Sequence, residues 1–372
     1  RPDDRRRMAD PLHNSSAAQP LGVLVVDDSA LYRQMLVNLV AGISGAEVVG
    51  TAADGVEAIA MIADLQPDVV TLDLVMPNLD GFGVLREIKR RKLQTQVVVV
   101  SSTAEEKAAA TVDALLLGAF DCILKPLGMP PHIARNEIGR ALGVRLGEIL
   151  ESKAAGRKSP RLTTPTAAGS TDAARKPSRG CIAIGASTGG PAALRVILSQ
   201  LTSAPSVPVF VVQHMPLKFI ESLAARLDEM ATFPVRLATD GLRVVAGTVY
   251  MAPAGFHLRV AANGGRHVCR LADDPPLHGC RPSYDRLLES LAEAYGSGVT
   301  AAVLTGMGRD GAAGCRLVKE AGGMVVAQHQ ASCAVYGMPK AVIEAGLADL
   351  VLPLDMIGKL FVGEHGPRRT GV

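Results

Sequence analysis

The 372-residue sequence contains no tryptophan, and aromatic residues make up only 3% of it. Hydrophobic residues still account for 48%, so aliphatic side chains must fill the interior, and the length allows two packed domains. The net charge of +3 is small and gives no reason to expect a nucleic-acid partner. The composition therefore predicts a globular protein with cores of Ala, Val, Leu and Ile.

Long apolar runs are absent as well. No stretch approaches the roughly 18–20 apolar residues that a membrane-spanning helix needs, and the basic run at 5–7 is not followed by the apolar core of a signal peptide. The cysteines show no CxxC spacing, which favours buried, reduced thiols over disulfides or zinc ligands. We therefore expect a soluble cytoplasmic protein without membrane insertion. The six cysteines are Cys122, Cys181, Cys269, Cys280, Cys315 and Cys333.

What the sequence does contain is a regular alternation of apolar runs and helical patterns, over residues 21–127 and again from Cys181 onward. Strands separated by helices of about 10–15 residues indicate βαβ units and hence parallel sheets. We predict two α/β domains with doubly wound parallel sheets and a small antiparallel insert within 233–272. The expected strands are 21–26, 47–52, 69–72, 97–100, 119–124, 181–184, 207–212, 299–304 and 324–327. The expected helices are 56–65, 80–91, 105–117, 133–150, 220–230, 283–294 and 313–321, with another one capped by Ser29.

A change of composition separates the two domains. Residues 152–179 are rich in Ser, Thr, Pro, Ala and basic residues and contain almost no large apolar ones. Such a stretch cannot bury enough surface to offset the entropy of ordering it, so we expect a flexible linker. The predicted division is a disordered extension at 1–20, a first domain at 21–150, the linker at 151–179, a second domain at 180–363 and a tail at 364–372.

Polar side chains stand at the carboxyl ends of the strands predicted for the first domain. Asp27 and Asp28 end the first strand and Asp73 ends the third, and such ends meet in one crevice. Three carboxylates there repel one another unless a hard cation such as Mg²⁺ is bound. Ser101 and Lys125 end the next two strands and bring a hydroxyl and an ammonium to the crevice. A single strand-end acid is usually only solvated, but five matching positions favour a site for Mg²⁺ and a phosphoryl group.

These residues resemble the receiver domain of bacterial response regulators over 21–140, through VVDDS at 25–29, LDLVMPNLDG at 72–81, VSS at 100–102 and KP at 125–126. The resemblance implies a flavodoxin-like fold in which a histidine kinase phosphorylates Asp73. It also implies that Asp27, Asp28, Asp73 and the backbone carbonyl of Val75 hold Mg²⁺. Ser101 and Lys125 are then expected to sense the phosphoryl group, and Lys125–Pro126 is expected to be a cis peptide.

A serine occupies the apex of a glycine turn in the second half. The pentad 185–189, GASTG, follows an apolar run and precedes a helical pattern, so Ser187 can be an exposed nucleophile, with glycines that allow the turn and leave room for a substrate. His214 and Asp310 each follow another predicted strand. If these strands are neighbours, the three side chains meet at one edge and form a triad of nucleophile, base and orienting acid.

Each part of this triad also has an ordinary structural interpretation. A GxSxG pentad is common by chance in a chain rich in Ala and Gly, a lone strand-end histidine is more often structural, and an aspartate in a glycine loop usually serves the turn. Three strand ends that supply Ser187, His214 and Asp310 together favour the catalytic interpretation. The chain order differs from the Ser…Asp…His order of α/β-hydrolases, and a GxGxxG dinucleotide fingerprint is absent from the turn.

The second half resembles the catalytic domain of chemotaxis protein-glutamate methylesterases, through IGASTGG at 184–190, VQHMP at 212–216, YMAP at 250–253, RPS at 281–283, LTGMGRDG at 304–311 and YGMP at 336–339. With the receiver, the resemblance covers 21–363. It implies a Rossmann-like domain in which Ser187, His214 and Asp310 are catalytic and Thr188 and Met307 are their neighbours.

The resemblance also implies an activity. The family hydrolyses glutamate methyl esters, and deamidates glutamines, on the cytoplasmic helices of chemoreceptors during chemotactic adaptation, and no cofactor is needed beyond Mg²⁺ in the receiver. The implied partners are methyl-accepting chemoreceptors and a chemotaxis histidine kinase as phosphodonor, and we expect a monomer. Cys280 stands where a histidine is frequent and Tyr284 where a small apolar residue is common, and both are candidates for receptor docking.

The presence of both domains in one chain predicts that the receiver regulates the catalytic domain. An unphosphorylated receiver is expected to cover the catalytic crevice, and phosphorylated Asp73 is expected to shift it away. The alternatives are a phosphorylation-gated serine hydrolase for another ester and a non-enzymatic regulator. A DNA-binding regulator is disfavoured, because it predicts a basic helix-turn-helix domain of about 60–70 residues after the linker, where this chain has a long α/β pattern.

Overall fold

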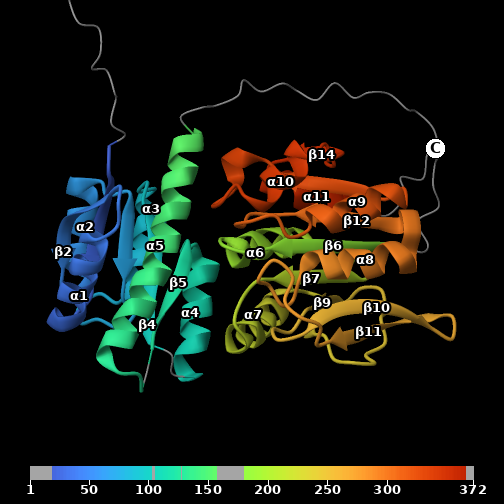
Figure 1. The fold of residues 1–372 in the computed structure, drawn as a ribbon, viewed down its shortest axis with the longest axis horizontal. Helices are drawn as coiled ribbons and strands as arrows, with labels where there is room; N and C mark the ends of the chain where they lie inside the picture. The colour runs from blue at the N-terminus through green and yellow to red at the C-terminus, as the bar shows by residue number, and fades with distance from the viewer. Residues whose placement is uncertain (1–18, 103–104, 127, 157–179, 366–372) are drawn as a thin grey trace, which may run out of the picture.

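The computed structural model describes residues 19–102, 105–126, 128–156 and 180–365. Two α/β bodies lie side by side, and helices α4 (Glu105–Leu117) and α5 (Pro131–Gly156) of the first are on the side that faces the second (Figure 1). None of the helices in these ranges combines the length and the apolar character that crossing a bilayer requires. The expected extension at 1–20 and the expected linker lie almost entirely outside the described residues.

The first domain is a five-stranded parallel sheet in the order β2-β1-β3-β4-β5. Strands β1 and β3, both inside the sheet, are buried along their whole length, as their largely apolar sequences predict. This order places the ends of β1, β3, β4 and β5 next to one another. The strands are β1 (Leu21–Val26), β2 (Ala46–Ala52), β3 (Val69–Leu72), β4 (Gln96–Ser102) and β5 (Asp121–Lys125). The other helices are α1 (Ala30–Ala41), α2 (Gly55–Leu65) and α3 (Gly81–Arg91).

The helices of this domain begin where the sequence predicts. Ser29 caps α1 by accepting from the Tyr32 amide, and Asp54 caps α2 by accepting from two amides. Helix α5 is longer than expected, because it continues past Leu150 to Gly156 and Lys153 in its last turns pairs with Asp68. The cis peptide of the described residues is Arg281–Pro282 and not Lys125–Pro126, so that expectation is wrong.

The second domain is a seven-stranded parallel sheet in the order β14-β13-β12-β6-β7-β9-β8. Strand β6 (Cys181–Ala186) pairs with β12 (Val299–Val303) on one side and β7 (Val209–Gln213) on the other. These are the three strands that precede Asp310, Ser187 and His214. The remaining strands of this sheet are β8 (Val235–Leu237), β9 (Val249–Met251), β13 (Met324–Gln328) and β14 (Leu350–Leu352). The helices are α6 (Gly190–Gln200), α7 (Leu217–Met230), α8 (Tyr284–Tyr295), α9 (Ala312–Glu320), α10 (Met338–Glu344) and α11 (Leu354–His365).

The predicted small antiparallel insert is confirmed. Strands β10 (His257–Asn263) and β11 (Arg266–Ala272) form an antiparallel hairpin, closed by Gly264 and Gly265, both with positive φ. Strands β8 and β9 lie in the same stretch but join the parallel sheet, where β9 is buried and pairs with β7, and β8, with Arg236 exposed, forms the edge. The last elements, α10, β14 and α11, were not predicted, since two are short and α11 follows a proline in a weakly periodic segment.

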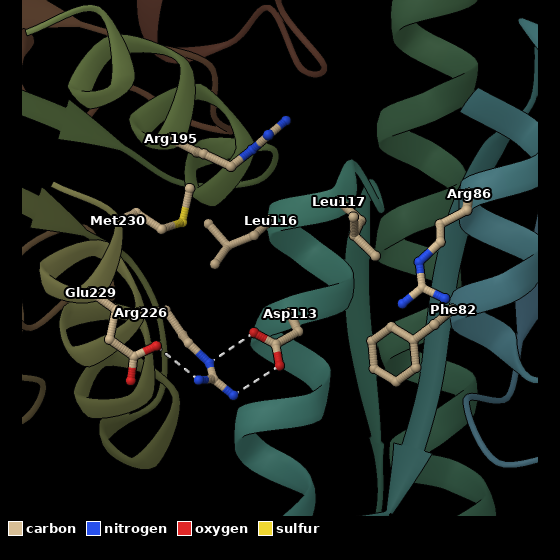
Figure 2. A pocket seen from close by; sticks show the side chains of 9 residues that line it. All are labelled: Phe82, Arg86, Asp113, Leu116, Leu117, Arg195, Arg226, Glu229 and Met230. Atoms are coloured by element: carbon tan, nitrogen blue, oxygen red, sulfur yellow. Dashed lines mark hydrogen bonds and ion pairs between the residues drawn. The ribbon is translucent and has the colours of Figure 1, made fainter. Parts of the chain in front are cut away.

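The two domains share an apolar cluster. Ala108, Val112 and Leu116 on α4 pack together with buried residues of α6 and α7. At the rim of this contact, the Arg226 guanidinium lies 2.9 Å from the Asp113 carboxylate (Figure 2). The receiver-like domain is thus held against the second domain by aliphatic burial at the centre and an ion pair at the edge.

Candidate active site and phosphorylation site

The strand ends of the first domain bring the predicted acidic residues together. Lys125 Nζ lies 2.8 Å from Asp27 Oδ2 and 2.5 Å from Asp73 Oδ2, so one ammonium joins the ends of three strands. Carboxylate oxygens of Asp27, Asp28 and Asp73 lie within 4.8 Å of one another. Ser101 is buried at the end of β4, where it pairs in register with Leu124 of β5.

The charges of this cluster explain why a cation fits it. Three carboxylates face one ammonium, which leaves a net charge of −2 for a divalent ion to neutralise. Burial raises the pKa of Asp27, and the neighbouring Lys125 partly offsets that effect. Burial disfavours the charged form of Lys125, but Asp73 and Asp27 outweigh it and raise the pKa of the ammonium. Oxygen donors close together are the ligands that Mg²⁺ prefers, so the residues fit the ion.

The carbonyl of Val75 was predicted as a further ligand. The chain turns sharply after Asp73, and the Val75 N–H donates to Asp73 Oδ1 at 3.3 Å, while the Val75 side chain is exposed. This local bond holds the Asp73 carboxylate in place at the mouth of the crevice.

In the second domain, the three predicted residues follow three neighbouring strands. Ser187 lies in the turn between β6 and α6, where its N–H donates to the Thr305 carbonyl at 3.0 Å. His214 follows β7, and its backbone N–H donates to the Ala186 carbonyl at 3.0 Å. The structure therefore places Ser187, His214 and Asp310 at one edge of one sheet, as the sequence predicts.

The pair His214–Asp310 is formed, and the pair Ser187–His214 is not. Nε2 of His214 lies 2.8 Å from Asp310 Oδ2. Within the described part of the chain, no hydrogen bond joins Ser187 Oγ to the imidazole. Catalytic hydrogen bonds without substrate are often long, so the two side chains remain compatible with a nucleophile and its base. Since Asp310 takes Nε2, Nδ1 is the nitrogen left to accept a proton.

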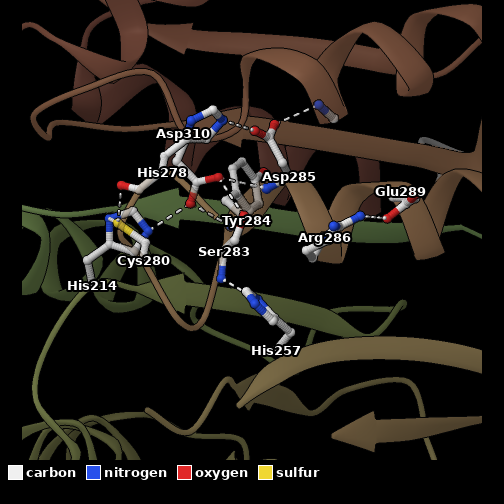
Figure 3. Close-up of polar contacts among 11 residues, drawn as sticks. His214, His257, His278, Cys280, Ser283, Tyr284, Asp285, Arg286, Glu289 and Asp310 are labelled. Atoms are coloured by element: carbon white, nitrogen blue, oxygen red, sulfur yellow. Dashed lines mark hydrogen bonds and ion pairs between the residues drawn. The ribbon is translucent and has the colours of Figure 1, made fainter. Parts of the chain in front are cut away.

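Asp310 is held by four donors. Besides His214, its carboxylate accepts from Ser283 Oγ at 2.7 Å, from the Tyr284 N–H at 2.7 Å and from the Asp285 N–H at 3.1 Å (Figure 3). The last two are amides at the start of α8, where a helix favours negative charge. Asp310 is almost completely buried, and burial alone raises its pKa, but these bonds, led by His214, lower the pKa overall.

The pKa of His214, the hydrogen-bond partner of Asp310, is shifted in the opposite direction. Burial favours the neutral form of His214, yet the hydrogen bond to Asp310, followed by the Cys280 thiol, raises the pKa of the imidazole to about 9. A fixed carboxylate beside a strongly basic ring is the arrangement that stabilises an imidazolium during proton transfer.

Comparison with known proteins identifies both halves. The CheB methylesterase family matches residues 182–361 and the response regulator receiver domain matches 23–135. Protein-glutamate methylesterase/protein-glutamine glutaminase of Symbiobacterium thermophilum is 42% identical, over 91% of this chain and 95% of its own. The protein of the same name from Geobacillus kaustophilus is 42% identical, over 91% of this chain and 97% of its own. The chain belongs to the protein-glutamate methylesterase family.

Two solved structures are similar to parts of this chain. The crystal structure of the Thermotoga maritima CheB methylesterase catalytic domain is 43% identical, with a TM-score of 0.49, and covers 50% of this chain and 99% of its own. The response regulator domain of Thermotoga maritima CheB is 39% identical, with a TM-score of 0.33, and covers 36% of this chain and 97% of its own.

One of the two departures from the methylesterase family pattern is structural. Tyr284 is completely buried, and its hydroxyl lies within 3.1 Å of the carbonyls of Ala183 and Ala302. The suggestion that it contributes to receptor docking is therefore wrong. A Cβ at Gly185 or Gly311 would come within 2.6 Å of its ring. Gly185 thus makes room for Tyr284 and not for a substrate.

The other departure lies beside the predicted catalytic base. Cys280 Sγ is 3.8 Å from His214 Nδ1, on the side of the ring opposite Asp310 (Figure 3). Cys280 and Ser283 were not predicted to contact the triad, because the loop that carries them follows the β10–β11 hairpin and reaches the sheet edge from outside the strand order. The RPS motif at 281–283 was the available signal.

A cavity of about 530 Å³ in front of Ser187 is walled by both domains. Thr188, predicted as an active-site neighbour, is buried beside Ser187, and Met307 lies opposite with its side chain half exposed. The receiver contributes Asp121, Arg145 and Glu148 from β5 and α5. The predicted site residues therefore face the receiver directly.

Glu148 is the least expected residue of this wall. It is only 6% exposed, and its Oε2 has no hydrogen-bond partner among the residues that the structure describes. Burial, followed by the nearby Asp121 carboxylate, raises the pKa of Glu148 to about 7, and the Arg145 guanidinium and Thr188 hydroxyl act against the rise. Glu148 therefore gains or loses its proton near neutral pH, on a wall of the cavity that also contains Thr188 of the second domain.

Proposed function

We propose that this protein is a protein-glutamate methylesterase and protein-glutamine deamidase that acts on chemoreceptor helices in the cytoplasm and is activated by phosphorylation of its receiver domain. The observation that carries the proposal is the position of Ser187 beside the Asp310–His214 pair, in a cavity shared with the receiver. Membership in the family supplies the substrate class, and the receiver supplies the means of control.

The geometry supports acyl transfer through serine. Ser187 Oγ attacks the ester carbonyl and passes its proton to His214 Nδ1, while Asp310 stabilises the imidazolium through Nε2–H. The protonated His214 then gives the proton to the leaving methoxide, and methanol departs. Water, deprotonated by the same nitrogen, cleaves the acyl-serine and releases glutamate. With glutamine as substrate, ammonia leaves in place of methanol.

The oxyanion needs donors other than the serine amide. The Ser187 N–H is already bonded to the Thr305 carbonyl. The N–H groups of Thr188 and Gly189 make no hydrogen bond within the described part of the chain, and they lie at the start of α6, where a negative charge is stabilised. Each such donor commonly contributes about 3–4 kcal/mol to transition-state stabilisation.

The proposed control of esterase activity begins at the cluster of Asp27, Asp28 and Asp73 in the receiver. Asp73 is the proposed acceptor of a phosphoryl group from a histidine kinase, and Asp27, Asp28 and the Val75 carbonyl are proposed to hold Mg²⁺ beside it. The ion, when bound, offsets the charge of the phosphoryl oxygens. Ser101 and Lys125 are positioned to contact those oxygens, and Lys125 would then exchange carboxylate contacts for phosphoryl ones.

The interface carries this change to the active site. Helices α4 and α5 follow the strands that bear Ser101 and Lys125, and they also contact the second domain. A shift of either helix on phosphorylation opens the cavity to a receptor helix. We propose that the arrangement in the structure, with both domains lining the cavity, is the covered state that prevails before phosphorylation.

The test is methanol release from receptor membranes that carry labelled methyl esters. The expected result is release by the full chain that increases when a small phosphodonor and Mg²⁺ are added. A soluble methyl ester is assayed in parallel. Turnover of that ester without any release from receptors would replace the proposal by a hydrolase of small esters, and no turnover of either would reject an esterase.

A further inference from the structure

The thiol next to the catalytic histidine is the feature that the proposed mechanism leaves unused. Cys280 Sγ lies 3.8 Å from His214 Nδ1, which is long for a hydrogen bond between neutral groups. Zinc binds cysteine sulfur at about 2.3 Å and histidine nitrogen at about 2.0–2.1 Å, so a tetrahedral ion places the two ligand atoms roughly 3.5 Å apart. The observed distance is within a few tenths of an ångström of that value.

We infer that Cys280 and His214 form a binding site for a thiophilic divalent cation such as Zn²⁺, and that the bound cation switches the enzyme off. This inference rests on the proposed function only for its inhibitory effect, because binding itself can be measured without any substrate. Donor atoms of His214, Cys280 and Asp310 all lie within 4.8 Å of one another.

The surroundings of His214 prepare it to be a metal ligand. A metal-binding histidine usually donates its second ring N–H to a carboxylate, which fixes the tautomer and the direction of the lone pair. Asp310 takes this role at Nε2 and leaves Nδ1 facing the sulfur. The Asp310 oxygens already accept from Ser283, Tyr284 and Asp285, so Asp310 orients the ligand and does not itself need to bind the ion.

The position of Cys280 is set by its backbone. Leu277 and Cys280 exchange two backbone hydrogen bonds, of 3.0 and 2.9 Å, across a tight turn in which His278 and Gly279 have positive φ. Both donor residues line the cavity in front of Ser187, so the remaining coordination positions are open to water. Two fixed ligands with open positions are typical of a weak, exchangeable site and not of a structural one.

Ligand chemistry separates this site from the acid cluster of the receiver. Sulfur and imidazole nitrogen select zinc and cadmium, whereas three carboxylates select magnesium. The same chain can therefore respond to Mg²⁺ through Asp73 and to Zn²⁺ through Cys280. Inhibition follows directly, because a cation on Nδ1, with Nε2–H held by Asp310, leaves the imidazole no lone pair for the serine proton.

The binding experiment uses the full chain in saturating Mg²⁺, titrated with Cd²⁺ and followed by the ultraviolet cadmium–thiolate absorption, with Zn²⁺ as competitor. The variants are Cys280→Ser and His214→Gln, and the matched control is Cys333→Ser, since Cys333 is also partly buried but bonds only backbone carbonyls. We expect Cys280→Ser to abolish the absorption and His214→Gln to weaken binding at least about tenfold. The control should bind like the original protein. Equal Cd²⁺ binding by Cys280→Ser overturns the site.

The activity experiment measures methanol release with and without Zn²⁺, each variant against its own metal-free rate. Zn²⁺ should inhibit the original protein and Cys333→Ser, a chelator should restore the rate, and Cys280→Ser should need at least about tenfold more Zn²⁺ for half inhibition. Equal inhibition of Cys280→Ser overturns the regulatory role. If no methanol is released even without Zn²⁺ while Cd²⁺ binding still depends on Cys280 and His214, the proposed function fails and the metal site stands.

Discussion

The two chemical sites of this chain neutralise their buried carboxylates in different ways. In the receiver, Asp27 and Asp73 share one ammonium from Lys125, and with the exposed Asp28 beside them the site keeps an excess of negative charge. In the second domain, one carboxylate, Asp310, is satisfied by an imidazole, a hydroxyl and two amides. The first arrangement retains negative charge that a divalent cation would neutralise, whereas in the second both oxygens of Asp310 already accept hydrogen bonds.

This contrast indicates how each site can be controlled. The receiver cluster keeps charge that an ion and a phosphoryl group would change, which suits the proposed switch. In the second domain the Asp310–His214 pair is already in place, so the proposed control acts on access to the cavity that both domains line. Substitutions at each site can test this division between a switch and a catalyst whose access is controlled.

The largest effect is expected at the nucleophile. Ser187→Ala should lower methanol release by about 10³-fold or more, because the covalent step is lost. The fold should survive, since Ser187 Oγ makes no hydrogen bond in the described part of the chain, and circular dichroism checks this. The matched control is Ser199→Ala, an exposed serine on α6 that follows the same turn. Activity retained in Ser187→Ala would remove serine from the mechanism.

The second largest effect on methanol release is expected when the proposed phosphorylation site, Asp73, is removed. Asp73→Asn should remove the stimulation by a phosphodonor, which we expect to be about 5- to 150-fold as for other coupled sites, and should leave basal methanol release in place. Asp64→Asn, at an exposed position of α2, is the control. Removal of Mg²⁺ should act like Asp73→Asn. Loss of basal activity in Asp73→Asn would contradict the separation of switch and catalyst.

A moderate effect is expected from the protonation of Glu148. Its pKa rises to about 7 in the covered state from an ordinary value of 4.5, so the covered state binds the extra proton. The contribution to closure is fully present below about pH 4.5 and is lost as the pH rises through 7. The groups that face the Glu148 carboxyl are Asp121, Arg145, Glu151 and Thr188.

The measurement is a ratio of methanol-release rates without phosphodonor. The rate of the original protein is divided by the rate of Glu148→Gln at each pH from 5 to 8. The ratio cancels the titration of His214, and it should rise by at most about tenfold per pH unit and level off above pH 7. Glu137→Gln, at an exposed position of the same helix and not among the groups that face Glu148, should keep the pH dependence. A ratio that does not change with pH would remove Glu148 from the control of access.

The smallest effect is expected at the rim of the interface. Arg226→Ala removes a partly exposed ion pair with Asp113, and such pairs contribute about 0.2–1 kcal/mol. Basal methanol release should rise by about 1.5- to 5-fold, and the exchanged pair Arg226→Asp with Asp113→Arg should reverse most of the rise. A double-mutant cycle that gives no coupling would show that the apolar contact of α4 holds the domains unaided.

The sequence predicted the strand-end residues of both sites, because position at the carboxyl end of a parallel strand follows from the apolar run before it. Ser187, His214 and Asp310 lie where that rule puts them. The rule cannot predict Cys280, Ser283 or Tyr284, because they reach the site from a loop beyond the hairpin. Their places depend on tertiary contacts, such as the fit of the tyrosine ring over Gly185, that no local pattern encodes.

The helices and strands show the same limit of prediction from local sequence patterns. Long apolar strands such as β1 and β6 were predicted within a residue or two, whereas β8, β9 and β14 have three residues each and too little periodicity to be recognised. The extra turns of α5 were also missed, since alanines in a polar segment fit a linker as well as a helix.

The aliphatic residues of α4 give activation an energetic consequence. Ala108, Val112 and Leu116 belong to the hydrophobic cluster that also contains the interior of the second domain. When the domains separate, this surface enters water at a cost of about 25 cal/mol for each Å² exposed. Under the proposed activation, the active form exposes this apolar surface, and a partner that covers α4 would then prolong activity after the phosphoryl group is lost.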